Sequence, residues 1–304
     1  MADRPGWYPP DAIELLVRLN DALHAVDDGE GGNRWLHARS ITIFDEMFDA
    51  VAPDLPPLAA LDAVCLGAGT RNPLAFSLLL YLAGARRVWV VDPELADSTE
   101  DWKLRWGLQE MALRVLLGDI RSRHFRRAPA TIDGFVDLQA LFFGSSTRRA
   151  LRDDTVRLVG AYLEDAAIPA ASVGVVTSRS VLEHVTETER CFDALAAMVA
   201  PGGVMCHHVD FSAHDDRDRF AFYYTAPESE GRRSDGLNGL RLSDYLRAFT
   251  ARGFACRVVD ARIDREYDLG RRPLAPRFAG YGEDDLRCAR AALVCVKVPR
   301  LSGV

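Results

Sequence analysis

The chain has 304 residues, of which 48% are hydrophobic, and its formal net charge is −7 at pH 7. An acidic chain without a basic stripe argues against nucleic acid or a membrane surface as partner. The first residues do not resemble a signal peptide, and no apolar run reaches the roughly 20 residues of a membrane span. We therefore expect a globular cytoplasmic protein with no nucleic-acid or membrane partner.

The cysteines support a reducing compartment. There are six, with no Cys-x-x-Cys spacing, and most stand in apolar strand-like runs. We expect buried free thiols at all of them.

The first 60 residues are predicted to form an N-terminal helical cap, with helices over about 11–26 and 40–51. From residue 61 to 304 we expect one domain in which strands alternate with helices, which favours an α/β fold with a parallel sheet. The strands are expected at 63–66, 87–91, 156–163, 173–177, 204–209, 254–259 and 292–298. Residues 97–150 form a predicted helical insertion, and the polar stretch 212–240 a second insertion.

The most informative motif joins the first two predicted strands. Gly67 and Gly69 follow the first strand and allow the backbone to approach a ligand closely. Asp92 ends the second strand, where a carboxylate can bind ribose hydroxyls. A dinucleotide fingerprint would need a third glycine at the position of Asn72, and no Gly-Lys-Ser/Thr follows the turn as in a P-loop.

Five segments, in this order and spacing, resemble the class I S-adenosylmethionine-dependent methyltransferases. They are the glycine motif 66–71, Asp92, the acidic segment 164–169, the Ser-x-x-Val-Leu-Glu-His-Val segment 178–185 and the Pro-Gly-Gly turn 200–203. The resemblance covers roughly residues 60–299.

This resemblance implies a Rossmann-like, seven-stranded, mostly parallel sheet with helices on both faces, plus the N-terminal helices and the helical insertion. It also implies S-adenosylmethionine as cofactor, with Asp92 at the ribose and Asp165 at the adenine amino group. The cofactor-binding residues that it implies are Gly67, Ala68, Gly69, Thr70, Asp92, Pro93, Asp165, Ala166, Ser178 and Arg179.

The helix after the glycine turn is similar to a narrower group of bacterial methyltransferases. Residues 72–74 (Asn-Pro-Leu) and 78–85 carry this likeness. Members of the group often act in polysaccharide or natural-product biosynthesis, which implies a small-molecule or sugar-like acceptor.

Methyl transfer to a hydroxyl needs a group that removes the proton, and open α/β sheets present such groups at the carboxyl ends of strands. His208 or His214 is the predicted general base, Asp210 its orienting partner, and His184 a further catalytic candidate. His207 and His208 point to opposite sides of an extended strand, so only one of them is expected to face the site.

Several alternatives stay open at this point. A divalent metal would use Glu183, His184 and His207 or His208, but Ser180 stands where a further glutamate ligand is expected, so our main prediction includes no metal. Methylation of nitrogen or carbon is a second alternative, and a non-catalytic nucleoside-binding protein is a third. A homodimer also stays open.

Overall fold

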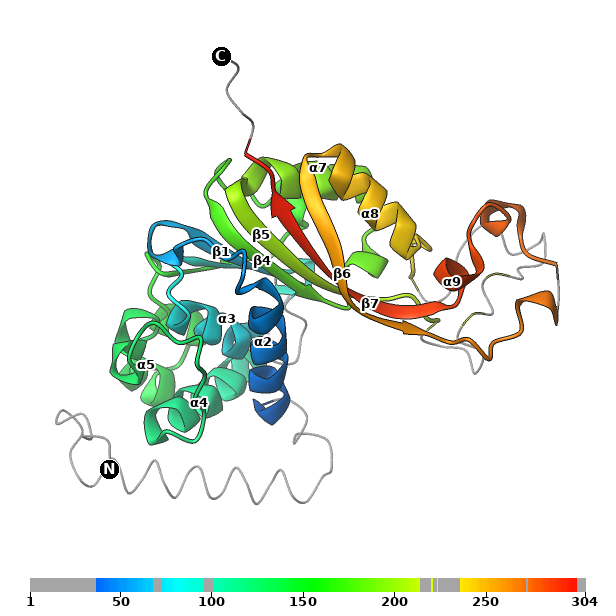
Figure 1. Ribbon diagram of the computed structural model, residues 1–304. Coiled ribbons are helices and arrows are strands. Elements are labelled where there is room, and N and C mark those ends of the chain that lie inside the picture. Colours follow the sequence, from blue (N-terminus) through cyan, green and yellow to red (C-terminus); the bar gives the residue numbers. More distant parts are fainter. Residues whose placement is uncertain are drawn as a thin grey trace, which may run out of the picture. The chain divides into compact units, whose positions relative to one another are not determined.

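The structure is a computed structural model, and it describes residues 37–67, 73–95, 101–213, 220, 223, 236–271 and 273–299 (Figure 1). The helices are α2 (His37–Val51), α3 (Pro73–Leu82), α4 (Asp101–Leu117), α5 (Leu138–Phe143), α6 (Thr147–Ala150), α7 (Thr188–Met198), α8 (Leu242–Ala251) and α9 (Glu283–Leu286). The strands are β1 (Asp62–Leu66), β2 (Val88–Val91), β3 (Val156–Val159), β4 (Val173–Arg179), β5 (Val199–Asp210), β6 (Phe254–Ile263) and β7 (Cys288–Lys297). Within this described part of the chain, no helix is long and apolar enough to cross a membrane.

The seven strands form one sheet in the order β3-β2-β1-β4-β5-β7-β6. The pairs β1–β2, β2–β3 and β4–β5 are parallel, whereas β7 runs antiparallel to both β5 and β6. The predicted Rossmann-like fold with a seven-stranded, mostly parallel sheet is thereby confirmed.

The chain divides into two compact units, which we describe separately. The first comprises Met1–Asp49 and Pro57–Tyr162, with β1, β2 and β3; the second comprises Ala50–Pro56 and Leu163–Val304, with β4 to β7. Most of the predicted cap at residues 1–60 and of the predicted insertion at 212–240 lies outside the described residues. The division into those parts therefore stays a prediction.

The first unit is built on short, buried strands. All five residues of β1 are buried, as is typical of an inner parallel strand. Asp62, the first residue of β1, is buried as well, and its carboxylate accepts hydrogen bonds from Arg86 Nε and Trp89 Nε1, each at 2.9 Å. These bonds offset the cost of burying the acid.

The described residues between β2 and β3 include α4, α5 and α6, and β3 is shorter than the strand predicted over 156–163. The last residue pair between β2 and β3 joins Val91 to Val159, because β2 has only four residues. Beyond that pair the chain leaves the sheet and forms a short 3₁₀ turn at Leu163–Asp165.

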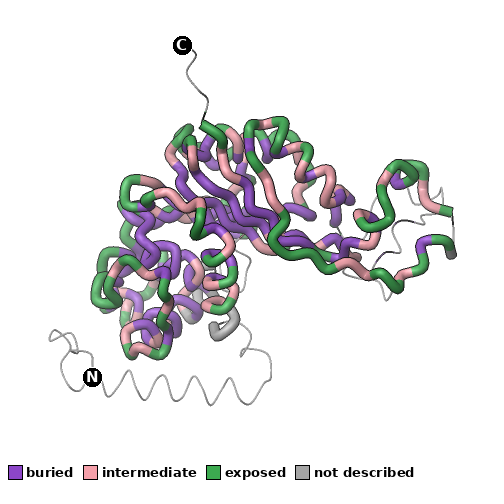
Figure 2. The backbone as a smooth tube through the Cα atoms, in the orientation of Figure 1, coloured by how far each residue is buried: buried purple, intermediate pink, exposed green. Residues whose placement is uncertain are grey.

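In the second unit, α7 and α8 lie over one face of the sheet, and the inner strands β4 and β5 are largely buried (Figures 1 and 2). Phe192 of α7 packs edge-on against Phe249 and Tyr245 of α8, with ring centroids 5.0 and 5.8 Å apart. This aromatic cluster forms the core between the two helices and the sheet.

Strand β5 begins at Val199 and so includes the Pro-Gly-Gly segment that we expected as a turn before a strand at 204–209. A Cβ on Gly203 would lie 2.8 Å from the carbonyl oxygen of Val173 in β4. Glycine is required there because the two strands approach each other too closely for a side chain.

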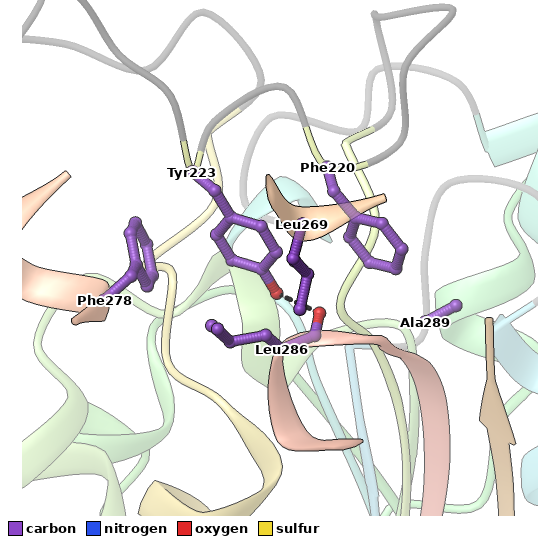
Figure 3. Close-up of a cluster of buried hydrophobic side chains, with 6 residues drawn as sticks. All are labelled: Phe220, Tyr223, Leu269, Phe278, Leu286 and Ala289. Carbon is purple, nitrogen blue, oxygen red and sulfur yellow. Dashed lines mark hydrogen bonds between the residues drawn. The ribbon is translucent and has the colours of Figure 1, made fainter. Parts of the chain in front are cut away.

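Strands β6 and β7 are also longer than predicted, reaching Ile263 and starting at Cys288. A separate hydrophobic cluster lies where β7 begins (Figure 3). Its buried members are Phe220, Tyr223, Leu269, Phe278, Leu286 and Ala289. The Tyr223 hydroxyl donates to the carbonyl oxygen of Leu286 at 2.5 Å, which ties the segment after β5 to the start of β7.

Arg241, just before α8, is fully buried beside this cluster. Its guanidinium donates to four carbonyl oxygens, those of Phe211, Asp285, Leu286 and Cys288. One buried cation thus connects the end of β5 with the start of β7.

Candidate functional site

The first part of the predicted cofactor site lies at the end of β1. Gly67 has a φ of 64°, a conformation that favours glycine, and its N–H donates to the carbonyl oxygen of Val91 at 2.8 Å. Ala68, Gly69 and Thr70 lie outside the described residues.

Asp92 follows β2 in the same unit and has an exposed fraction of only 7%. Its Oδ1 accepts the backbone N–H of Glu94 at 2.9 Å, and its own N–H donates to the carbonyl oxygen of Val159 at 3.1 Å. The short 3₁₀ turn at Pro93–Leu95 thus holds the carboxylate at the tip of the strand.

The acidic segment of the second unit lies in the 3₁₀ turn after β3. The side chain of Asp165 is 57% exposed and pairs with Arg190 of α7 at 3.1 Å. The neighbouring Ala166 is buried. An exposed ion pair of this kind contributes little stability, so the Asp165 carboxylate can exchange Arg190 for another hydrogen-bond donor.

Ser178 and His207 form a buried pair between β4 and β5. Their side chains are joined by a 2.7 Å hydrogen bond between Oγ and Nδ1, and the His207 ring stacks on Phe249 of α8. Burial, with a smaller effect from His208, lowers the pKa of His207 to about 3. His207 is therefore a neutral core residue, and it lies on the α8 face of the sheet.

His208 lies on the opposite face and is only partly buried. Arg179 of β4 stands directly across from it. Burial lowers the pKa of His208 to about 4; the charges of Arg179 and Arg290 act in the same direction, and Asp260 opposes them. The imidazole is thus neutral at neutral pH, and the charges of two arginines and one aspartate act on it.

Glu183 follows β4 in the 3₁₀ turn Leu182–His184 and is 3% exposed. Its Oε1 accepts the backbone N–H of Asp210 at 3.2 Å, whereas its Oε2 has no hydrogen-bond partner among the described residues. Burial raises the pKa of Glu183 to about 8; hydrogen bonds from its own backbone N–H and that of Asp210 oppose this effect, and the charge of Asp210 adds to it. Glu183 is therefore largely protonated at neutral pH.

The same end of the sheet carries two further predicted residues, Asp210 and His184. Oδ1 of Asp210 accepts the backbone N–H of Ser212 at 3.0 Å and also its hydroxyl. His184 is exposed. His214 lies outside the described residues. Ser180, which has a φ of 51°, donates its N–H to the carbonyl oxygen of His208 at 2.8 Å, so the loop after β4 is tied to β5.

The structure thus brings His208, Asp210, Arg179 and Glu183 to the ends of β4 and β5, and it separates His207 from them on the other face. In the described part of the chain, no three His, Cys, Asp or Glu residues are arranged to hold a metal ion.

Sequence reasoning missed two arginines on the His208 face, Arg262 of β6 and Arg290 of β7. Each is directly opposite the other across the antiparallel pair. The signal in the sequence was a lone arginine between alanines, Ala289 and Ala291, at the start of an apolar strand.

Similar solved structures include three proteins. One is an S-adenosylmethionine-dependent methyltransferase from Mesorhizobium loti, with 17% identity and a TM-score of 0.41 over 82% of this chain and 96% of that chain. Another is the YcgJ protein from Bacillus subtilis, with 14% identity and a TM-score of 0.42 over 86% and 100%. The third is CrArsM, an arsenic(III) S-adenosylmethionine methyltransferase from Chlamydomonas reinhardtii, with 15% identity and a TM-score of 0.43 over 83% and 68%.

At the level of sequence, a search of curated proteins found no match. The sequence model of a family described as a methyltransferase domain matches residues 43–259, which is well over half of the chain.

Proposed function

Because this chain belongs to the methyltransferase-domain family, we propose that it transfers the methyl group of S-adenosylmethionine to an oxygen atom of a small-molecule acceptor. The observation that carries the proposal is the partly buried, neutral His208 beside Asp210 at the carboxyl end of β5. Open α/β sheets bind their ligands at this end of the strands. We therefore place the methyl acceptor at the carboxyl end of β5, next to the side chains of His208 and Asp210.

The residues of the first unit fit the methyl donor. Gly67 has a positive φ at the end of β1 and carries no side chain that would block a ligand there. The carboxylate of Asp92 is held at the tip of β2 by the N–H of Glu94. Asp92 would accept hydrogen bonds from the ribose hydroxyls, and the backbone at Gly67 would approach the polar end of the ligand. When bound, S-adenosylmethionine supplies an electrophilic methyl group on a sulfonium.

His208 then removes the proton of the acceptor hydroxyl, and Asp210 helps to orient the imidazole ring of His208. The bound cofactor would supply the methyl group to the hydroxyl oxygen and keep the electron pair of its sulfur–carbon bond, and His208 would hold the proton of the hydroxyl. A neutral imidazole is the state that this step needs, because an imidazolium cannot accept a proton. Glu183 holds the backbone of Asp210 and so positions the end of β5.

The six cysteines are all free thiols, which supports our expectation that the protein works in a reducing compartment such as the cytoplasm. The small-molecule acceptor itself belongs, in our proposal, to natural-product or polysaccharide biosynthesis.

The proposal is tested by incubating the purified chain with methyl-labelled S-adenosylmethionine and two matched sets of small acceptors, one with hydroxyls and one with amines. We expect S-adenosylhomocysteine to form with members of the hydroxyl set and the label to appear on oxygen in the product. Label on nitrogen or carbon would overturn O-methylation. Binding of the cofactor without turnover by any acceptor would support a nucleoside-binding protein instead.

A further inference from the structure

The face of the sheet that carries His208 also carries a cross-strand row of charged residues in the second unit. Asp210 of β5 is paired with Arg290 of β7, and Arg290 with Arg262 of β6. Directly opposite residues of neighbouring strands share one face, as do residues two apart on one strand. Arg262 and Arg290 therefore lie on the same face as Asp210 and His208.

The register of the strands brings further charged residues to this row. Arg179 stands directly across from His208 in β4, and Arg290 stands across from Asp210, two residues after His208. The charges of both arginines lower the pKa of His208. The carboxylate of Asp260 has the opposite effect and raises the pKa of His208. On the other face, His207 packs under α8, so the His208 face is distinct from the helix-covered core.

Arg262 and Arg290 differ from Arg252 and Arg257 of the same unit. Arg252 and Arg257 each pair with a carboxylate, at 2.6 Å in both cases. Arg262 and Arg290 are exposed, and neither forms an ion pair with any residue that the structure describes. Two like charges directly opposite each other destabilise a sheet. An anion between them would remove this cost.

The position of Arg290 is also well defined. The buried guanidinium of Arg241 donates to the carbonyl oxygen of Cys288 at 2.5 Å and to that of Leu286 at 3.3 Å. These bonds fix the start of β7 two residues before Arg290. A guanidinium on a rigid strand is well suited to bind an oxyanion with two parallel hydrogen bonds.

We propose that the methyl acceptor carries an oxyanion, a carboxylate or a phosphate group, and that Arg262 and Arg290 bind it beside His208. This inference rests on the proposed function, since it assigns the acceptor of the same site. Binding of the oxyanion would offset the positive charges around His208 and so make its imidazole a better proton acceptor. The acceptor hydroxyl would thus meet its base only when the anionic group is in place.

The first test uses inorganic phosphate and acetate as probes, with sodium chloride at matched ionic strength as reference. A ligand that binds the folded state raises the Tm. We expect phosphate, acetate or both to raise the Tm of the unaltered chain and of the control Arg265→Gln, an exposed arginine just after β6. The probe with the larger difference in effect between the unaltered chain and Arg262→Glu identifies the group as phosphate or carboxylate, because phosphate also stabilises folded proteins without a site.

The decisive variant is Arg262→Glu, which replaces the like-charge pair with an ion pair to Arg290. In chloride we expect it to melt at a higher temperature than the unaltered chain, yet to lose the response to phosphate and acetate. Arg290→Gln should lose the response as well. The proposal is overturned if neither probe raises the Tm of the unaltered chain beyond chloride, or if Arg262→Glu responds as the unaltered chain does.

A second readout locates the anion and separates this inference from the proposed function. Nuclear magnetic resonance of labelled histidine should show a saturable shift of the His208 ring signals with the effective probe, and no such shift in Arg262→Glu. Neither measurement needs methyl transfer. If the anion responses appear while no hydroxyl acceptor is methylated, the proposed function fails and the anion site stands; methylation of neutral acceptors without any anion response overturns the anion site alone.

Discussion

The backbone N–H of Asp210 donates to Oε1 of Glu183 across 3.2 Å, and this bond joins the turn after β4 to the last residue of β5. The Glu183 carboxyl is buried, and its Oε2 has no hydrogen-bond partner among the described residues. Burial raises the pKa of this carboxyl to about 8. The Leu-Glu-His segment thus links the ends of β4 and β5. Burial of the Glu183 carboxyl lowers the stability of the folded protein.

Glu183 should make the stability of the protein depend on pH. Its pKa rises from 4.5 to about 8 on folding, so its favourable contribution is fully present below about pH 4.5 and is lost as the pH rises through about 8. Glu183→Gln mimics the neutral acid and should be more stable than the unaltered chain at about pH 9, by on the order of 1–3 kcal/mol. Urea unfolding at about pH 6 and about pH 9 measures this. An equal pH dependence in both proteins would contradict the assignment.

His208→Gln should reduce turnover by roughly 10²–10⁴-fold, the usual contribution of a general base, while the affinity for S-adenosylmethionine stays within about twofold. His124→Gln, a change in the first unit, serves as the control because His124 pairs with Asp49 and has no part in the proposed site. Turnover is measured as S-adenosylhomocysteine formed with a hydroxyl acceptor. Unchanged turnover in His208→Gln would remove this residue from the reaction.

His207→Ala should behave in the opposite way from His208→Gln. The ring fills the core under α8 and bonds to Ser178, so its loss should cost about 2–4 kcal/mol of unfolding free energy. His207→Phe, which keeps an aromatic ring on Phe249, should recover part of that loss. The free energy of unfolding of the two variants is measured with urea. A core role of His207 predicts the loss in His207→Ala, whereas a role in binding the methyl acceptor predicts that both variants are as stable as the unaltered chain.

Arg241→Met should destabilise the second unit by about 3–5 kcal/mol, since four carbonyl oxygens lose a buried charged donor. Arg241→Lys should not restore stability, because an ammonium cannot reach the same set of acceptors in a planar arrangement. Hydrogen exchange at the start of β7 provides a local readout. Protection there equal to that of the unaltered chain would show that the guanidinium does not hold this strand.

Much of the fold could be predicted from the sequence because its signals are local. Apolar runs such as the one ending at Leu66 predict buried strands, and Gly84 after α3 marks a helix end. Strand lengths were less predictable, because the length of a strand depends on the neighbouring strands with which it pairs. β3 stops where β2 has no further residue to pair. β5 begins as early as Val199 because this residue still pairs with Val173 of β4, across an irregularity that contains Gly203.

The same contrast applies to the site. Gly67 and Asp92 could be located because each stands at a strand end with a recognisable residue type. The facing of Arg262 could not be predicted, since the register of β6 against β7 shifts at a bulge between Val258 and Asp260. Such a shift moves every later side chain to the other face, and nothing in the local sequence marks it.

Calorimetric titration of the full chain with S-adenosylmethionine tests the central claim most directly. We predict saturable binding to the unaltered chain and to the control Glu94→Ala, whose exposed side chain lies two residues after Asp92. Asp92→Ala should bind the cofactor at least about tenfold more weakly, because the ribose hydroxyls lose a charged acceptor. Absence of binding to the unaltered chain at millimolar cofactor, or equal affinity in Asp92→Ala, would contradict the account.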